Sequence, residues 1–151
     1  MNFSRTTSAN PDFQHLVSLL DEFLRIVDGD DHSFYAQFNK IVNLTNVIVC
    51  YSEGKAVGCG AFREYDQNTV EIKRMYVLPQ YRGRGVGHGI LKELELWAHE
   101  SGYPSYILET GNKQQEAIAL YKKSGYTIIP NYGQYQSVEN SVCMKKNVMD
   151  V

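Results

Sequence analysis

Four glycines alternate with other residues where an extended segment gives way to a helical one, in Arg82-Gly83-Arg84-Gly85-Val86-Gly87-His88-Gly89. Glycine inside a helix costs about 1 kcal/mol relative to alanine, so this repetition indicates a compensating role. The first amides of a helix lack internal partners and lie at the positive end of its dipole, which makes them an anion site. With Arg82 and Arg84 adding charge, the segment predicts a phosphate site. A structural turn with solvated arginines is the alternative.

The spacing of these glycines does not fit the two commonest nucleotide-binding patterns. The dinucleotide pattern GxGxxG fails because His88 stands three residues after Gly85. The ATP-binding pattern fails because no Gly-Lys-Ser/Thr follows. The segment also comes after antiparallel strands, not after the first strand of a βαβ unit. The sequence therefore favours another phosphate-bearing ligand.

The elements that position this turn follow from hydrophobic periodicity and from turn residues. Asn10 and Pro11 fit the cap and first position of a helix that ends at Gly29. The other expected helices cover residues 33–40, 85–101 and 113–124, and the expected strands cover 2–8, 46–52, 56–65, 69–78, 105–110, 126–129 and 141–146. This order, β-α-α-β-β-β-α-β-α-β-β, predicts a mixed α/β sheet with helices on both faces.

The composition is that of one globular domain, expected to span residues 1–151. Hydrophobic residues make up 43% and charged residues 21%, which argues against disorder and a membrane-embedded chain. A net charge of −2 argues against nucleic-acid binding, and a basic centre suits a small anionic ligand. The cysteines and histidines lack metal-ligand spacing, so we expect buried free thiols and no metal. Without a recognisable signal peptide or membrane span, we expect a cytoplasmic protein.

Three blocks of residues together resemble a known family. Arg82-x-x-Gly85-x-Gly87 resembles the acyl-CoA signature of the GCN5-related N-acetyltransferase (GNAT) superfamily. The preceding segment, Glu71–Val77, resembles the central strand of that family, and Asn112 with Ala117–Tyr126 resembles its "N…A…LY…GF" element. The order and spacing of the blocks fit, and the resemblance covers residues 45–146 best. It implies an enzyme that moves an acetyl group from acetyl-CoA directly to a primary amine, within a GNAT-like fold.

The resemblance implies a donor site between two splayed parallel strands, residues 69–78 and 105–110. Backbone groups of the first strand would hold the acetyl and pantetheine parts as an added strand does. Amides of the glycine turn would hold the pyrophosphate. The residues expected to contact acetyl-CoA are Met75, Tyr76, Val77, Arg82, Gly83, Arg84, Gly85, Val86, Gly87, Asn112 and Tyr121.

The same resemblance implies the groups that handle protons. Tyr121 matches the usual acid of the family, which protonates the departing sulfur; a core aromatic is its alternative interpretation. The amide of Val77 would donate to the carbonyl oxygen as charge develops on it. Glu71 and Glu109 are the candidate bases, although either could be a salt-bridged strand residue, and many relatives use ordered water instead.

The acceptor site is expected near residues 28–38 and 131–138, and its candidate residues are Asp31, His32, Tyr35, Arg74 and Tyr135. Carboxylates and aromatics suit a polyamine or a basic peptide, whereas Arg74 would favour an amino-acid-like acceptor. We expect a small-molecule amine. The alternatives are a protein or peptide acetyltransferase and a CoA-binding sensor without catalysis. Edge strands near 2–8 and 141–147 would allow a homodimer.

Overall fold

The structure is a computed structural model that describes residues 1–29 and 43–148. The strands are β1 (Asn2–Thr6), β2 (Asn46–Ser52), β3 (Lys55–Asp66), β4 (Thr69–Val77), β5 (Ser105–Gly111), β6 (Thr127–Ile129) and β7 (Ser141–Asn147). The helices are α1 (Pro11–Asp28), α3 (Val86–Glu100) and α4 (Gln115–Lys123), with 3₁₀ turns at Pro79–Tyr81 and Gly133–Tyr135. The helix expected at residues 33–40 lies outside the described residues.

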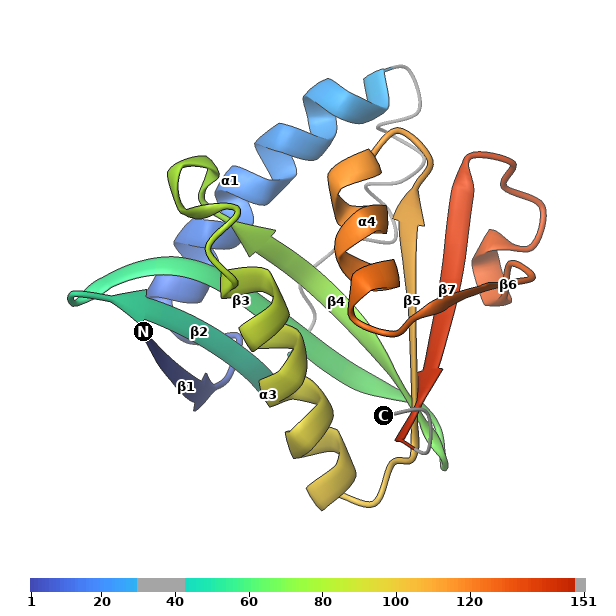
Figure 1. The fold of residues 1–151 in the computed structure, drawn as a ribbon, viewed down its shortest axis with the longest axis horizontal. Coiled ribbons are helices and arrows are strands. Elements are labelled where there is room, and N and C mark those ends of the chain that lie inside the picture. The colour runs from blue at the N-terminus through green and yellow to red at the C-terminus, as the bar shows by residue number, and fades with distance from the viewer. Residues whose placement is uncertain (30–42, 149–151) are drawn as a thin grey trace.

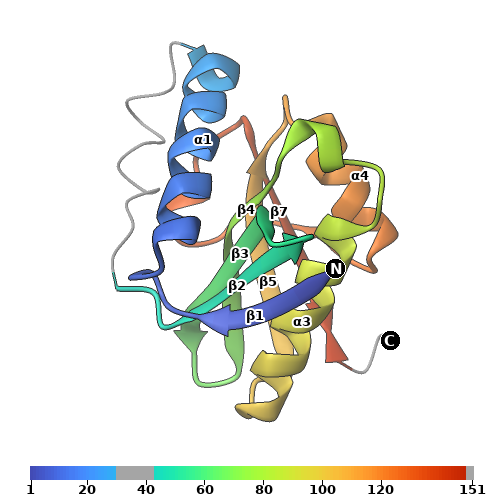
Figure 2. The same ribbon diagram turned by 90° about the vertical axis from the view of Figure 1, so that its left-hand side faces the viewer.

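The strands form one sheet in the order β1-β2-β3-β4-β5-β7-β6. All neighbours are antiparallel except β4 and β5. Helix α1 covers one face of the sheet, and α3 and α4 cover the other (Figures 1 and 2). The predicted mixed α/β sheet with helices on both faces is therefore confirmed.

Two sequence expectations about the end of the chain need correction. Residues 141–147 do not form an edge strand, because β7 lies between β5 and β6 and pairs with both. The short strand β6 occupies that edge instead. Helix α4 also begins two residues later than expected, because Gly111–Gln114 form a turn closed by the amide of Gln114 donating to the carbonyl of Gly111 at 3.0 Å.

Helix α1 begins as its sequence predicts. The side-chain oxygen of Asn10 accepts from the amides of Asp12 and Phe13 at 2.8 and 3.2 Å, and Pro11 follows as the first helical residue. Phe13 and Leu16 are buried against the sheet. The cap therefore sets where the helix starts, and the apolar stripe sets which face meets the strands.

Helix α3 packs closely on β3 because β3 carries glycine beneath it. A Cβ added at Gly58 would lie 2.9 Å from Val86 Cγ1, and one added at Gly60 would lie 2.5 Å from Met75 Sδ and 2.9 Å from Ile90 Cγ2. All three distances are shorter than real Cβ contacts, so side chains here would displace the helix and the side chain of Met75. The three cysteines are buried free thiols, as expected.

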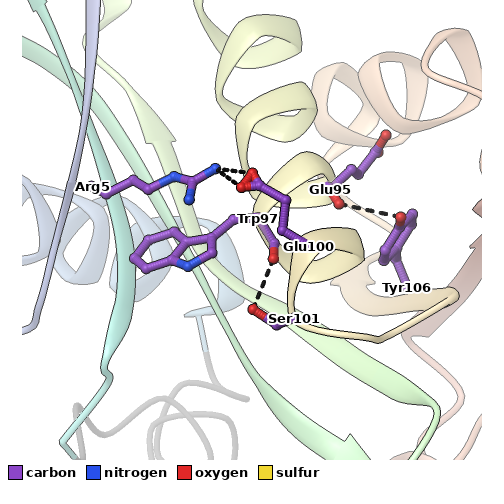
Figure 3. A network of polar contacts seen from close by, with 6 residues as sticks. All are labelled: Arg5, Glu95, Trp97, Glu100, Ser101 and Tyr106. Atoms are coloured by element: carbon purple, nitrogen blue, oxygen red, sulfur yellow. Dashed lines mark hydrogen bonds and ion pairs between the residues drawn. The ribbon is translucent and has the colours of Figure 1, made fainter.

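The edge strand β1 is fastened to α3 by Arg5 (Figure 3). Its guanidinium donates to both oxygens of Glu100 at 2.8 and 3.0 Å and lies 4.9 Å from the centre of the Trp97 ring. Nearby, the Tyr106 hydroxyl of β5 donates to the backbone carbonyl of Glu95 at 3.2 Å. The ion pair is exposed to solvent, so it adds little to stability.

A buried ionic cluster joins α3 to β7, which lies next to the edge strand β6. Lys146 of β7 lies 2.9 Å from one oxygen of Glu95, and the hydroxyl of Tyr126 donates to the other at 2.8 Å. Both charged side chains are about nine-tenths buried. A buried carboxylate needs such partners, since an unpaired one costs several kcal/mol.

Candidate functional site

The strands β4 and β5 pair over a short stretch and then separate. The ladder joins Thr69–Glu71 to Ser105–Ile107, and beyond it the two strands diverge toward their carboxyl ends (Figure 1). The diverging strands bound a cavity of about 80 Å³, here called the interstrand cavity. Its walls are Leu20, Leu24, Glu71, Ile72, Lys73, Arg74, Met75, Glu109, Thr110, Gly111, Gln114, Tyr121 and Tyr135. The predicted gap between splayed parallel strands is present.

A bulge in β4 coincides with this divergence. The register between β3 and β4 shifts between Cys59 and Ala61, and Arg74 has a φ of 59°. A residue other than glycine in this left-handed region costs roughly 1–2 kcal/mol. The bulge bends β4 and leaves the backbone from Ile72 to Val77 without ladder partners on the β5 side. That open edge can accept an extended ligand as an added strand.

The glycine turn follows β4 and leads into α3. Gly83 and Gly85 have φ values of 78° and 82°, and Gly85 caps the helix. The first helical hydrogen bond runs from the amide of Gly89 to the carbonyl of Gly85 at 2.9 Å. The amides before Gly89 in α3 therefore have no carbonyl one turn back to bind. A Cβ at Gly83 or Gly85 would meet nothing within 4 Å, so these two glycines serve the backbone conformation.

The later glycines of the segment serve packing, which the sequence did not reveal. A Cβ at Gly87 would lie 2.9 Å from Leu120 Cδ2 of α4, and one at Gly89 would lie 2.4 Å from the Phe3 ring of β1. Gly87 thus allows α3 and α4 to approach each other. The residues that a side chain would meet, Leu120 and Phe3, lie on other elements far away in the sequence. The spacing of the glycines therefore does not indicate this packing role.

The two arginines of the turn differ in how they are held. Arg82 donates through Nε to the carbonyl of Val77 at 2.9 Å, and its guanidinium lies 5.5 Å from the centre of the Tyr76 ring. Arg84 is exposed, with its guanidinium 5.3 Å from the centre of the Tyr81 ring. Both add positive charge around the free amides of the turn. Arg82 also ties the turn to the end of β4.

Tyr121 faces the interstrand cavity from α4. It is 7% exposed, and its hydroxyl has no hydrogen-bond partner among the described residues. Burial, and next the negative charge of Glu109, raise its pKa well above the usual tyrosine value. The phenol is therefore protonated at neutral pH and can donate a proton into the cavity. Its ring also packs edge-on against Tyr126 at 6.0 Å, so it has a structural role as well.

The two candidate bases have different surroundings. Glu71 is buried, and its Oε1 accepts from Arg63 at 3.0 Å while its Oε2 accepts from the Tyr132 hydroxyl at 2.6 Å. Glu109 is half-buried, and its Oε2 accepts from the Ser141 hydroxyl at 2.6 Å. Both side chains line the interstrand cavity. Burial lowers the pKa of the adjacent Lys73, and the charge of Glu71 partly opposes that shift.

The expected acceptor residues are only partly described. Arg74 is buried and forms an ion pair with Asp21 of α1, while its Nε is buried without a hydrogen-bond partner. Tyr135 is 2% exposed, and both residues line the interstrand cavity. The other three expected residues, Asp31, His32 and Tyr35, lie outside the described residues.

Asn112 lies at the end of β5 but does not line the interstrand cavity, where Gln114 stands instead. The backbone amide of Asn112 donates to the backbone carbonyl of Asn140 at 2.8 Å, which ties the turn before α4 to the start of β7. The contacts made by Asp21 and Ser141 were missed by sequence reasoning. Each meets its partner only through the fold, and neither belongs to a recognisable motif.

The described residues offer neither a metal site nor a membrane-spanning helix. Among the residues that the structure describes, no group of three or more histidine, cysteine or acidic side chains could hold a metal ion. Within residues 1–29 and 43–148, no helix is long and apolar enough to cross a membrane.

Comparison with known proteins places this fold and cavity in one family. The model of the acetyltransferase (GNAT) family matches residues 13–126. A relative from Azospirillum brasilense, named IAA acetyltransferase, is 32% identical over 139 residues, which span 87% of this chain and 89% of the relative. The chain therefore belongs to the GNAT acetyltransferase family and is an acyltransferase of the N-acetyltransferase type.

Solved structures agree with this assignment. A Klebsiella pneumoniae protein described as an acyl-CoA N-acyltransferase superposes with a TM-score of 0.82 at 30% identity, covering 97% of both chains. A GNAT acetyltransferase from Elizabethkingia anophelis, solved with acetyl-CoA bound, has a TM-score of 0.67 at 18% identity and covers 97% of both chains. The second likeness concerns the fold alone. The family uses acetyl-CoA and acts on amine acceptors.

Proposed function

We propose that this protein transfers the acetyl group of acetyl-CoA directly to the primary amine of a small molecule. The observation that carries the proposal is the position of Tyr121, whose protonated hydroxyl faces the interstrand cavity together with Glu109. A proton donor and a carboxylate thus share the place where β4 and β5 separate. Acetyl transfer to an amine needs both kinds of group, because the amine loses a proton and the thiolate gains one.

The chain's own residues fit acetyl-CoA. The open β4 edge at Met75, Tyr76 and Val77 offers backbone groups to an extended pantetheine chain. The pyrophosphate would lie at the turn from Arg82 to Gly87, where Gly83 and Gly85 leave the amides uncovered. When bound, acetyl-CoA supplies the activated acyl carbon. Asn112 would act indirectly here, by fixing the turn that precedes α4.

Proton transfer is assigned from the surroundings of three side chains. Tyr121 gives its proton to the departing sulfur as the new C–N bond forms and the C–S bond breaks. Before the attack, Glu109 takes one proton from the acceptor ammonium, directly or through water, which leaves the neutral amine that forms the C–N bond. The nitrogen loses its second proton as the tetrahedral adduct collapses, and that proton returns to the Tyr121 oxygen. Glu71 is the weaker candidate for this step, because both of its carboxylate oxygens already accept short hydrogen bonds.

The acceptor is proposed to be a small amine that also carries a carboxylate. The cavity holds only about 80 Å³, and Leu20 and Leu24 of α1 close one side of it. Its polar wall has both signs of charge, with Glu109 as a carboxylate and with Lys73 and Arg74 as cations that also pair with Glu71 and Asp21. That mixture of charges favours an amino-acid-like acceptor over a polyamine, because the two cations would attract a carboxylate and repel a second ammonium.

The test measures thiol release from acetyl-CoA with a panel of amino acids, polyamines and short basic peptides. We expect release above background with an amino acid. Tyr121→Phe should lower kcat by about 10²- to 10⁴-fold while calorimetry finds unchanged acetyl-CoA affinity. Tyr103→Phe is the matched control, because that hydroxyl contacts exposed Glu64 outside the cavity. If the protein binds acetyl-CoA but releases no thiol with any amine, the proposed transfer is refuted and the alternative of a CoA-binding sensor is supported.

A further inference from the structure

A buried carboxylate ties the loop at residues 131–138, here called the 131–138 loop, to the middle of the sheet. Glu71 of β4 has only 2% of its side chain exposed. Its Oε1 accepts from Arg63 of β3 at 3.0 Å, and its Oε2 accepts from the Tyr132 hydroxyl at 2.6 Å. The side chain therefore connects two adjacent strands to a loop about sixty residues later in the chain.

These hydrogen bonds are of the strong kind. Glu71 forms an ion pair with Arg63 at 3.0 Å, so the bond from Tyr132 has a charge-assisted acceptor and is stronger than a neutral one. Burial, and next the charge of Glu71, raise the pKa of Tyr132 far above its usual range. The Tyr132 phenol therefore stays a donor throughout the physiological pH range.

Tyr132 in turn holds Tyr135. The Tyr132 carbonyl accepts from the amide of Tyr135 at 2.9 Å, which closes the 3₁₀ turn, and the two rings pack edge-on with centres 5.8 Å apart. Tyr65 of β3 also packs edge-on against Tyr132, with ring centres 5.3 Å apart. Tyr135 is then buried with its side chain in the wall of the interstrand cavity. The path from Glu71 to the cavity wall is thus continuous.

We propose that Glu71 and Tyr132 are positioning residues that hold the 131–138 loop against the cavity and thereby set the affinity for the acceptor amine. Glu71 acts through Tyr132, and Tyr132 acts through Tyr135. The part of this inference that concerns the acceptor rests on the proposed function. The part that concerns the loop does not, and the two are tested separately.

The loop is tested by hydrogen exchange in the free protein. Tyr132→Phe keeps both ring contacts and removes the hydroxyl that binds Glu71. We expect the amides of Tyr135 and Val138 to exchange roughly 10- to 100-fold faster, the effect of losing a hydrogen bond to a charged group. Tyr65→Phe is the matched control, because it belongs to the same aromatic cluster but does not contact Glu71. Equal exchange in the two variants would overturn the proposal, whatever the protein catalyses.

The acceptor is tested with the panel amine that gives the fastest thiol release. Tyr132→Phe should raise the KM for that amine about 10-fold and leave kcat and acetyl-CoA affinity near those of Tyr65→Phe. Glu71→Gln keeps an oxygen that accepts from Tyr132, so its kcat should fall by less than about 10-fold. A fall of about 10²-fold or more in Glu71→Gln, with unchanged loop exchange, would make Glu71 the base and overturn its positioning role. Absence of thiol release from the unsubstituted protein would refute the proposed function and leave the exchange result to decide the loop.

Discussion

Replacing Lys146 by methionine removes the cation that faces Glu95 and keeps a long apolar side chain in its place. The Nζ lies 2.9 Å from Oε1, and the two side chains are 8% and 11% exposed. Tyr126 would remain as the partner of Oε2. Removing one member of a buried ion pair costs about 3–5 kcal/mol, because the other charge stays buried without its counterion. We expect Lys146→Met to lose that much free energy of unfolding.

Urea unfolding followed by circular dichroism measures this loss. With a slope of about 2 kcal/mol per molar urea, the midpoint should fall by about 1.5–2.5 M. The matched control is Arg5→Met, which removes the cation from the exposed pair with Glu100. Those two side chains are 38% and 45% exposed, so the urea midpoint of Arg5→Met should fall far less than that of Lys146→Met.

A double variant separates the buried charge from the loss of packing. Lys146→Met combined with Glu95→Gln has neither charge, and the glutamine oxygen can still accept from Tyr126. The double variant should recover most of the lost stability. The reasoning fails if Lys146→Met is no less stable than Arg5→Met, or if the double variant is less stable than Lys146→Met alone.

Two other perturbations follow from the same structure. Burial raises the pKa of Tyr121 and Tyr126 in the folded protein. The folded state therefore holds these two protons more tightly than the unfolded chain, whose tyrosines titrate at about 10. The resulting stability is complete below that pH and is lost as the pH rises above it. Urea midpoints measured from pH 7 to 11 should fall only above about pH 10; a constant midpoint would contradict this. Gly87→Ala should lower the free energy of unfolding by about 1–3 kcal/mol and weaken acetyl-CoA binding in calorimetry, because its methyl would meet Leu120. An unchanged urea midpoint and an unchanged acetyl-CoA affinity would show that Leu120 and α4 can move to accommodate the methyl group.

The parts of the fold that depend on local pattern were predictable from the sequence. Asn10 and Pro11 marked the start of α1, and the turn residues between 46 and 77 marked the antiparallel strands. The glycine turn was recognisable because Gly83 and Gly85 are needed for positive φ, a requirement set by neighbouring backbone atoms. Such signals lie within a few residues of the feature that they specify.

Features that depend on distant partners could not be predicted. Nothing near Arg74 indicates a left-handed residue, since the ion pair with Asp21 and the bulge opposite β3 arise only in the folded sheet. The position of β7 inside the sheet was missed for a similar reason, because its pattern does not say which strands flank it. Glu71 was a candidate base by its position, while its contacts with Arg63 and Tyr132 came from the structure.

The pairing of β5 has a consequence for the order in which the site is completed during synthesis. Strand β5 is held by β4 only at Ser105–Ile107, whereas β7 pairs with it from Ser105 to Gly111. The half of β5 that carries Glu109 therefore has its only strand neighbour in β7, the last strand of the described chain to leave the ribosome. Until β7 docks, the β2–β3–β4 hairpins can form but one wall of the cavity cannot. A nascent chain halted before residue 141 would thus have the β4 wall of the interstrand cavity without a fixed β5 wall.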